Sequence, residues 1–266
     1  MSGGADARTG LPRLLTWAVE VAVTLVLWGY FILGFVFFFA PLCLLAMALG
    51  HNRARAAQRL NNLFYRGFFR LCRLLMPRQR WEIDPALTAV SGSVVVCNHL
   101  SYLDPLLFIS LFPRHTTVVK ERLFRYPFLG WVLRASGYLA SGGPDSERTL
   151  EHLEGMRTFL AGGGNLFVFP EGTRSRDGSV GPLQAGAFKI ARLCRAPVAV
   201  AAIGNTQRLF TPGRFRFAAC RPNTITVRLL ARLTPAYDRP NFSTRALIAQ
   251  VRALLEPAAG GATAQG

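Results

Sequence analysis

An uncharged segment, residues 21–49, constrains the fold of this 266-residue chain more than any other feature. As one straight helix it would extend about 43 Å at about 1.5 Å per residue, whereas the hydrocarbon core of a bilayer is roughly 30 Å thick. The segment is also far too long for the apolar core of a signal peptide. We therefore predict that residues 1–50 form a membrane segment whose helix tilts, breaks or turns back.

Residues that can interrupt a helix occur within this segment: Gly29, Gly34 and Pro41. Arginines flank it on both sides: Arg8, Arg13, Arg53 and Arg55. Because positive residues tend to stay on the cytoplasmic side of a membrane, this arrangement places both ends there. We predict a re-entrant helical hairpin, with a single tilted span as the alternative.

The next region, residues 51–80, has the pattern of a basic amphipathic helix. Its apolar residues recur at intervals of three and four: Leu60, Leu63, Phe64, Phe68, Leu71, Leu74 and Leu75. Its arginines follow a neighbouring stripe: Arg59, Arg66, Arg70 and Arg73. At about 100° per residue the two stripes stay apart, which is typical of a helix that lies in the membrane interface. The alternative is a core helix with a solvated basic flank.

The charge of the chain favours an anionic partner. Lys and Arg total 31 against 14 Asp and Glu, a net charge of +17, which attracts either nucleic acid or the anionic surface of a bilayer. The arginines alternate with apolar residues, and the aromatic residues lie in apolar runs rather than on a stacking face. We therefore expect a bilayer with anionic lipids as the partner, and no nucleic acid.

Cysteine and histidine usage indicates neither a disulfide framework nor a metal site. The five cysteines are odd in number and contain no CxxC pair, which fits reduced thiols on the cytoplasmic side. His51, His115 and His152 lack the spacing of metal ligands. We expect no metal, and a location at the inner (cytoplasmic) membrane with the globular domain on its cytoplasmic face.

Residues 81–256 have the pattern of an α/β domain. Short β-rich runs alternate with helical stretches after Pro77, which predicts a mixed sheet covered by helices. The expected strands are residues 93–97, 116–119, 166–169, 198–203, 215–220 and 225–230. The expected helices are residues 102–110, 147–160, 186–194 and 244–255. The tail, residues 257–266, is rich in Ala and Gly and is expected to be disordered.

A polar cluster, CNHLSYLDP, separates two apolar runs at residues 97–105. Ser101 and Asp104 have the spacing of a capping box, which would start a helix at Tyr102 and leave His99 on the preceding loop. The His99 ring can then fold back and donate one N–H to the Asp104 carboxylate, so that its other nitrogen can accept a proton. The pair predicts a general base with its orienting carboxylate. A capped helix with an incidental histidine is the alternative.

A second polar cluster, FVFPEGTRSRDG at residues 167–178, also follows an apolar strand. Gly172 would let the backbone approach a ligand closely, Thr173 can donate its hydroxyl, and Arg174 carries a planar fork of donors suited to phosphate oxygens. The cluster predicts a phosphate-binding loop, although the same residue types also occur in ordinary turns.

Together the two clusters resemble the signature motifs of the glycerolipid acyltransferases. NHLSYLD has the His-x4-Asp spacing of that family, and FPEGTRS resembles its second motif. VVKERLFRYPFLGW and APVAVAAI resemble its linking segment and its Pro-led strand. The similarity covers about residues 92–205 and points to the lysophosphatidate (1-acyl-sn-glycerol-3-phosphate) acyltransferase type.

The resemblance implies a reaction and a role for each site residue. His99 would deprotonate the free hydroxyl of a lysophospholipid, and Asp104 would orient His99. The alkoxide would attack an acyl thioester, either acyl-CoA or an acyl carrier protein, without an acyl-enzyme and without a cofactor. Glu171, Gly172, Thr173 and Arg174 would hold the acceptor and its phosphate, and Lys120 would add charge to the same pocket.

Three departures from the family pattern affect the acceptor more than the base. The chain has Ser141-Gly142-Gly143 where the family usually has an arginine, Leu183-Gln184-Ala185-Gly186 where it has Phe-Lys-x-Gly, and Ala201 or Ala202 where it has a second proline. A different lysolipid or a specialised lipid is therefore an alternative acceptor to lysophosphatidate. A catalytically silent membrane protein that binds lipid or acyl carrier is the alternative from another class.

Overall fold

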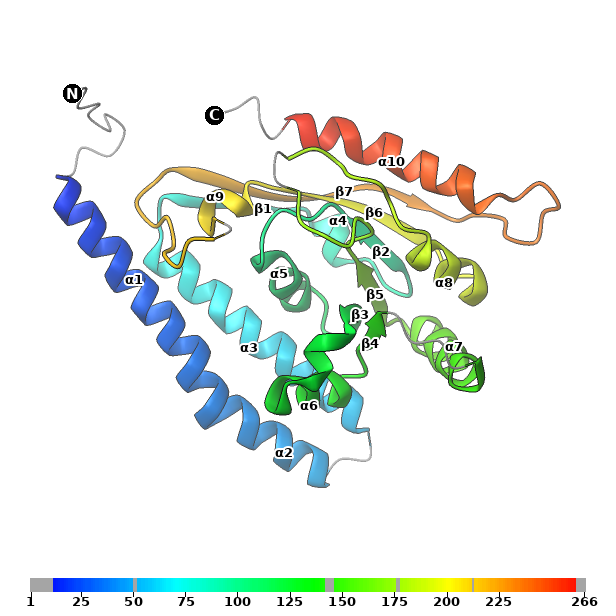
Figure 1. Ribbon diagram of the computed structural model, residues 1–266, viewed down its shortest axis with the longest axis horizontal. Coiled ribbons are helices and arrows are strands. Elements are labelled where there is room, and N and C mark those ends of the chain that lie inside the picture. Colours follow the sequence, from blue (N-terminus) through cyan, green and yellow to red (C-terminus); the bar gives the residue numbers. More distant parts are fainter. Residues whose placement is uncertain (1–11, 50–51, 142–145, 176–177, 212, 262–266) are drawn as a thin grey trace.

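The computed structural model describes residues 12–49, 52–141, 146–175, 178–211 and 213–261, which form a mixed sheet with helices on both faces (Figure 1). The strands of this part of the chain lie in the order β1-β7-β6-β2-β5-β3-β4. Strands β6, β2, β5, β3 and β4 run parallel, and β7 runs antiparallel to β6. The bounds are β1 Gln79–Ile83, β2 Val94–Cys97, β3 His115–Lys120, β4 Leu139–Ser141, β5 Asn165–Val168, β6 Val198–Gly204 and β7 Asn223–Leu233. The predicted α/β class with a mixed sheet is confirmed.

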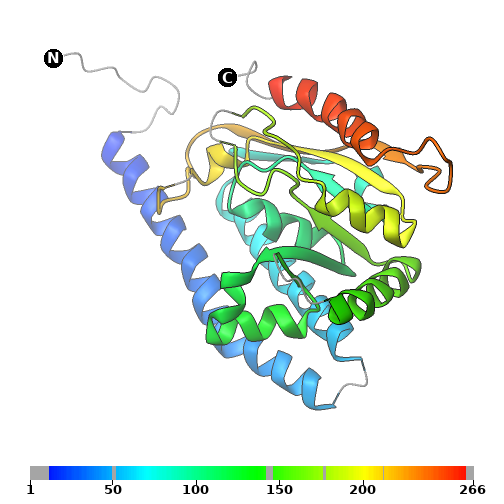
Figure 2. The same cartoon turned by 45° about the vertical axis from the view of Figure 1, so that its right-hand side comes forward.

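Helices cover both faces of the sheet, as Figures 1 and 2 show from two angles. On one side lie α3 (Arg53–Leu75), α5 (Leu103–Leu111) and α6 (Pro127–Ala135), and on the other side α7 (Ser146–Ala161), α8 (Gly186–Cys194) and α10 (Thr244–Gly261). Val95 of β2 packs in the core beneath α5, whereas Val94 and Val96 pack beneath α8 and α10. All of β2 is buried because both faces are covered, which explains its uninterrupted apolar sequence.

The apolar N-terminal segment is one continuous helix, so the predicted hairpin within it is wrong. It comprises α1 (Arg13–Gly34), a π-helical turn (Phe35–Phe39) and α2 (Ala40–Leu49). The π turn lies directly before Pro41, which has no N–H and whose ring presses on the carbonyl four residues earlier. Widening the helix there accommodates the proline without a break. The chain turns back only after Leu49, where α3 runs beside α2 (Figure 1).

One face of the α1–α2 helix packs on the domain, and the opposite face is exposed and apolar. Its buried residues follow a helical stripe: Val23, Thr24, Leu27, Phe39 and Cys43. Its exposed residues are mostly large and apolar, and include Leu14, Trp17, Leu25, Ile32, Phe37, Phe38 and Leu44. Residues 13–46 are the one stretch of the described chain that is helical, long and apolar enough to cross a membrane.

Helix α3 packs on the α/β unit through one face. That buried face carries the polar residues Gln58, Asn61 and Asn62. Gln58 and Asn61 donate hydrogen bonds to Ser136, and Asn62 donates to the carbonyls of Ile109 and Ser110. Strand β1 begins before residue 80, within the region expected to be the amphipathic helix.

The opposite face of α3 is exposed and carries the predicted basic stripe: Arg59, Arg66, Arg70 and Arg73. Leu63 and Leu74, which belong to the predicted apolar stripe, are also exposed on α3. The position of this helix in a membrane interface stays a prediction.

Two further expectations for the C-terminal half differ from the structure. Residues 215–220 form a loop, not a strand, because their backbone pairs outside the sheet: Phe217 N–H donates to Thr24 Oγ1 of α1, and Ala218 N–H to the Leu209 carbonyl of α9 (Thr206–Leu209). Helix α10 continues through Pro257 to Gly261, so the first half of the tail expected to be disordered is helical. The remainder of the tail lies outside the described residues.

Candidate active site

The predicted site residues meet at the carboxyl edge of the parallel strands. His99 follows β2, Gly172 and Arg174 follow β5, and Thr206 follows β6. Since β2 lies between β5 and β6, these three loops are neighbours. The crevice beyond the carboxyl ends of parallel strands is where α/β sheets usually bind ligands.

His99 and Asp104 form the predicted pair. His99 Nδ1 lies 2.9 Å from Asp104 Oδ2. The helix begins at Leu103, one residue later than predicted, and His99 lies on the loop before it, where its ring can fold back over the first turn. The Asp104 carboxylate is fully buried and accepts hydrogen bonds, so Nδ1 must be the donor. Nε2 of His99 is therefore the nitrogen that can accept a proton.

Four donors hold the buried Asp104 carboxylate. Besides His99, the backbone N–H groups of Leu100 and Ser101 donate to Oδ2, at 2.6 and 2.7 Å. The Thr206 hydroxyl donates to Oδ1 at 2.6 Å. A buried carboxylate is stable only when its oxygens are satisfied in this way. Asp104 is thus fixed in place before any substrate binds.

Two residues that shape the base were missed by sequence reasoning. Thr206, which contacts Asp104, is 102 positions away in the chain and had no local motif to mark it. Phe169, treated only as a strand residue, stacks on the His99 ring with centroids 4.3 Å apart and planes at 24°. The stacking fixes the plane of the imidazole, and the carboxylate fixes its rotation.

We expect Thr206→Val to lower kcat about tenfold with little change in KM. The variant removes a hydrogen bond to a buried charge, an interaction typically about 1.5–3 kcal/mol, and so loosens the carboxylate that orients His99. Steady-state kinetics would measure this. Thr206→Ser keeps the hydroxyl and should restore kcat; a serine variant as slow as the valine variant would contradict the positioning role.

Glu171 joins the two signature motifs. Its Oε1 accepts the His99 backbone N–H at 3.1 Å, and its Oε2 accepts the Gly181 N–H at 3.0 Å. The Ser175 N–H donates to the His99 carbonyl at 2.8 Å. The buried Glu171 carboxylate therefore holds the His99 loop against the loop of Gly172 and Arg174, and its contact with the acceptor stays a prediction.

Arg174 lies on the loop that follows β5, one residue before Ser175, which bonds to the His99 carbonyl. Its guanidinium carbon lies 3.4 Å above the centroid of the Tyr102 ring, a cation–π contact. Its Nη1 is buried and has no hydrogen-bond partner among the described residues. An unpaired buried donor is costly, and an anionic ligand oxygen would satisfy it. Gly172 has the left-handed φ of +67° that lets the loop turn here.

Thr173 and Lys120 are less closely integrated into the site. Both side chains are exposed. Lys120 ends β3, which is adjacent to β5 but two strands from β2. It therefore lies at the same edge of the sheet as the arginine loop, on the side away from Thr206.

Neither side chain that could act as a nucleophile near the base is activated. Ser101 is buried, and its hydroxyl donates to the Phe210 carbonyl at 3.2 Å and accepts from the Leu103 N–H. Burial, reinforced by the charges of Asp104 and Glu171, raises the pKa of the Cys97 thiol well above its usual value. The site is therefore suited to direct deprotonation of a bound hydroxyl rather than to a covalent enzyme intermediate.

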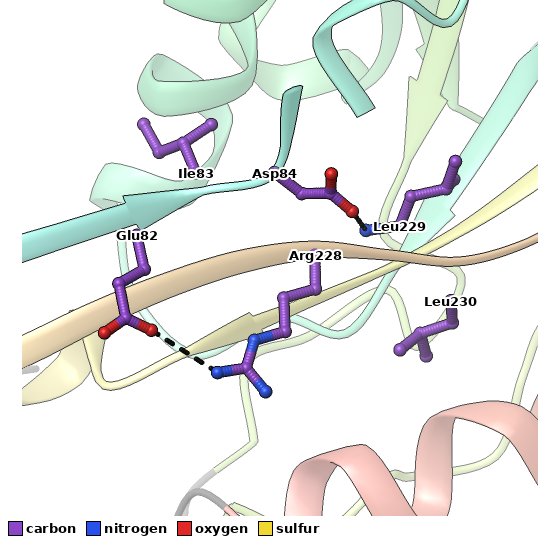
Figure 3. Close-up of a pocket in the computed structure, with 6 residues that line it drawn as sticks. All are labelled: Glu82, Ile83, Asp84, Arg228, Leu229 and Leu230. Atoms are coloured by element: carbon purple, nitrogen blue, oxygen red, sulfur yellow. Dashed lines mark hydrogen bonds and ion pairs between the residues drawn. The ribbon is translucent and has the colours of Figure 1, made fainter. Parts of the chain in front are cut away.

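A separate hollow between β1 and β7 has no part in this chemistry. The hollow has a volume of about 410 Å³. Figure 3 shows the residues that line it. Glu82 pairs with Arg228 at 3.4 Å, and Asp84 accepts the Leu229 N–H at 3.1 Å. Glu82 and Arg228 thus pair with each other, Asp84 is bonded to the backbone, and the sheet order separates this edge from β2.

Gln184 lies beside the arginine loop. Its side-chain amide fills the space next to the Cα of Gly172, and its backbone N–H donates to the Pro170 carbonyl at 2.8 Å. This is the position where the resemblance expected a lysine. Of the other two departures, Ala201 and Ala202 are buried in β6, and the segment 141–143 falls partly outside the described residues.

The paired motifs lie on an α/β fold, and comparison with known proteins agrees with the resemblance that these motifs carry. Residues 82–204 match the family model described as Acyltransferase. The fold is similar to that of the 1-acyl-sn-glycerophosphate (LPA) acyltransferase PlsC from Thermotoga maritima, with a TM-score of 0.67, 20% identity, and coverage of 92% of this chain and 99% of that chain. The resemblance of this segment to the glycerolipid acyltransferases is therefore confirmed.

Curated relatives carry the name 1-acyl-sn-glycerol-3-phosphate acyltransferase. The Brassica napus chloroplastic protein BAT2 is 32% identical over 120 residues, which is 45% of this chain and 35% of that protein. The Saccharomyces cerevisiae protein is 27% identical over 169 residues, 62% of this chain and 55% of that protein. The matched part of the chain thus spans between about a third and about half of the length of these relatives.

Proposed function

We propose that this chain is an O-acyltransferase that moves a fatty acyl group from an acyl thioester to the free hydroxyl of a lysophospholipid. The first candidate acceptor is 1-acyl-sn-glycerol-3-phosphate, which would give phosphatidate. The observation that carries the proposal is the His99–Asp104 pair at 2.9 Å, next to the loop of Arg174 with its unpaired buried nitrogen. The names of the relatives support the same acceptor.

The proposed reaction needs one base and no cofactor. His99 Nε2 takes the proton of the acceptor hydroxyl, and the alkoxide attacks the thioester carbonyl. The tetrahedral intermediate collapses, and the carbon–sulfur bond breaks. The leaving thiolate takes the proton from His99, which returns the imidazole to its neutral form. The thiol released is that of coenzyme A or of an acyl carrier protein. Because the thioester is already activated, a base worth about 10²- to 10⁴-fold is an appropriate catalyst.

We also propose that the α1–α2 helix lies along the domain and inserts its exposed apolar face into a bilayer. The helix is tied to the domain over much of its length, by Thr24 to the Phe217 N–H and by Trp28, which stacks on Phe215 with centroids 5.3 Å apart. These contacts support a helix that lies along the domain in place of a free span. Its exposed apolar face and the basic stripe of α3 support insertion into one leaflet of an anionic membrane, with the domain on the cytoplasmic face.

Replacing Arg59 and Arg66 with Gln should weaken binding to vesicles that contain anionic lipid about 30-fold, since each arginine near such a surface contributes about 1 kcal/mol. Vesicle co-sedimentation at fixed salt would measure this. Arg245→Gln with Arg252→Gln removes the same charge from α10, on the opposite side of the sheet, and should change binding little. Equal losses from both pairs would indicate a general charge effect and not an α3 docking face.

The test of the proposed function is a panel of acceptors. Purified protein in detergent is incubated with a labelled acyl-CoA or acyl carrier protein thioester and each of several lysophospholipids, and products are identified by mass spectrometry. We expect acylated product with lysophosphatidate. No product with any acceptor and either donor would favour a silent lipid-binding protein.

A lysolipid with a less charged head group is the second candidate acceptor, because the neutral Gln184 amide lies against Gly172 of the arginine loop. We expect Gln184→Lys to raise kcat/KM for lysophosphatidate about tenfold relative to an uncharged lysolipid, since a charged hydrogen bond contributes about 1.5–3 kcal/mol. Gln184→Met, similar in size and uncharged, is the control. An unchanged ratio in the lysine variant would mean that this position does not sense the head group.

A further inference from the structure

A second, apolar cavity lies where the N-terminal helix meets the site. It encloses about 130 Å³ between α1, α3, α5 and the loop after α9. Its lining includes Trp28, Phe31, Phe68, Tyr102, Leu106 and Phe210. The lining is almost entirely carbon, so the cavity is suited to hydrocarbon and not to water.

Tyr102 connects this cavity to the proposed catalytic groups. One side of its ring lines the cavity, and the Arg174 guanidinium lies 3.4 Å from the ring centroid. Tyr102 is three residues from His99, and the hydroxyl of the intervening Ser101 bonds to Phe210, another lining residue. The Arg174 guanidinium and the apolar cavity thus share one aromatic ring, which is three residues along the chain from the proposed base.

We propose that this cavity holds part of the acyl chain that the acceptor lipid already carries, so that α1 forms a wall of the acceptor site as well as a membrane contact. The inference rests on the proposed function. With its anionic head at Arg174, a single-chain lipid would pass across Tyr102 into the cavity and present its hydroxyl to His99. A cavity of similar size holds one benzene molecule, so only a few carbons of the chain would fit, and the rest would remain in the bilayer.

The acceptor, rather than the donor, fits this position because of where α1 lies. The wall contributed by α1 belongs to the helix whose other face is exposed and apolar, which is the face proposed to enter the bilayer. The acceptor is a bilayer lipid and would enter from that side. The donor is attached to a water-soluble carrier and would approach from the aqueous side.

The test fills the cavity and compares the two substrates. We expect Leu106→Trp to lower kcat/KM for lysophosphatidate about fifteenfold at a fixed donor concentration. The larger side chain would displace about two methylene groups of the acceptor chain from the cavity, and each displaced methylene lowers affinity about fourfold. The preference among donor chain lengths at fixed acceptor should not change. Leu193→Trp, an equal increase in size at an exposed position of α8 on the opposite side of the sheet, is the control and should leave both values unchanged. A changed donor preference, or no change in either value, would overturn the inference.

A binding measurement separates this inference from the proposed reaction. Lysophosphatidate with a photoreactive diazirine on its acyl chain is crosslinked to the full chain in detergent, and the labelled peptides are mapped. Label at Trp28, Phe31 or Phe210 that is lost in Leu106→Trp supports the inference even if no transfer is observed. Label confined to other segments overturns it even if transfer is observed.

Discussion

The His99→Ala variant is expected to lose acyl transfer by a factor of about 10²–10⁴, because it removes the nitrogen proposed to accept the proton of the acceptor hydroxyl. The Nδ1 side of the ring is already bonded to Asp104 at 2.9 Å, so the loss is that of the free Nε2. Three other donors still hold the Asp104 carboxylate in this variant, so we expect the fold to be retained. Turnover is measured with labelled thioester, and vesicle binding and the unfolding midpoint are measured in parallel.

Asp104→Asn should give a loss of similar size, because the amide has one acceptor oxygen where the carboxylate serves four donors. Asp238→Asn changes an exposed carboxylate paired with Arg195 and is the matched control, for which no change in turnover is expected. Wild-type turnover in a correctly folded His99→Ala protein would refute the assignment of the base.

Acid is expected to destabilise the fold through His115 at the start of β3. The ring is fully buried: Nδ1 donates to the Phe112 carbonyl at 2.7 Å, and Nε2 accepts from the Tyr138 hydroxyl at 2.7 Å. Burial lowers the pKa of His115 to about 4, and the Phe112 carbonyl opposes this only in part. The unfolded chain, with a pKa near 6.5, binds the proton more readily.

The stability that the neutral ring contributes is therefore complete above about pH 6.5 and is lost as the pH falls towards 4. The free energy of unfolding should decrease by about 3 kcal/mol over that range from this group alone. Urea unfolding at pH 7 and pH 4.5 would measure the change. His115→Leu combined with Tyr138→Phe removes the titrating group and its partner and should flatten the pH dependence. An equally steep dependence in that double variant would assign the acid sensitivity to other groups.

Sequence patterns predicted those parts of the fold that depend on local burial. Residues 186–194 were predicted as a helix with the bounds the structure gives, and β2, β5 and β6 were evident because apolar residues fill both faces of a central strand. Strand β1 was missed because it lies at the sheet edge, where only part of each face is covered and polar residues interrupt the pattern.

The parts that sequence reasoning could not supply depend on contacts between distant residues. The loop at residues 215–220 has strand-forming residues, but its Phe217 N–H donates a hydrogen bond to Thr24 Oγ1 of α1 and not to a neighbouring strand. The hairpin was expected from the length of the segment, from the arginines at both of its ends and from Gly29, Gly34 and Pro41, but a π turn accommodates the proline within a continuous helix. In the site, the spacing of His99 and Asp104 was readable from one short motif, whereas the contribution of Thr206 required the sheet to bring β6 beside β2.

The paired hydrogen bonds between the His99 loop and the Glu171–Ser175 loop make the two motifs a single mechanical unit. Glu171 and Ser175 bond to the backbone N–H and carbonyl of the residue that carries the imidazole, so a displacement of the arginine loop would also displace His99. We therefore expect that exchanging either motif alone for that of a relative would disturb the position of the imidazole.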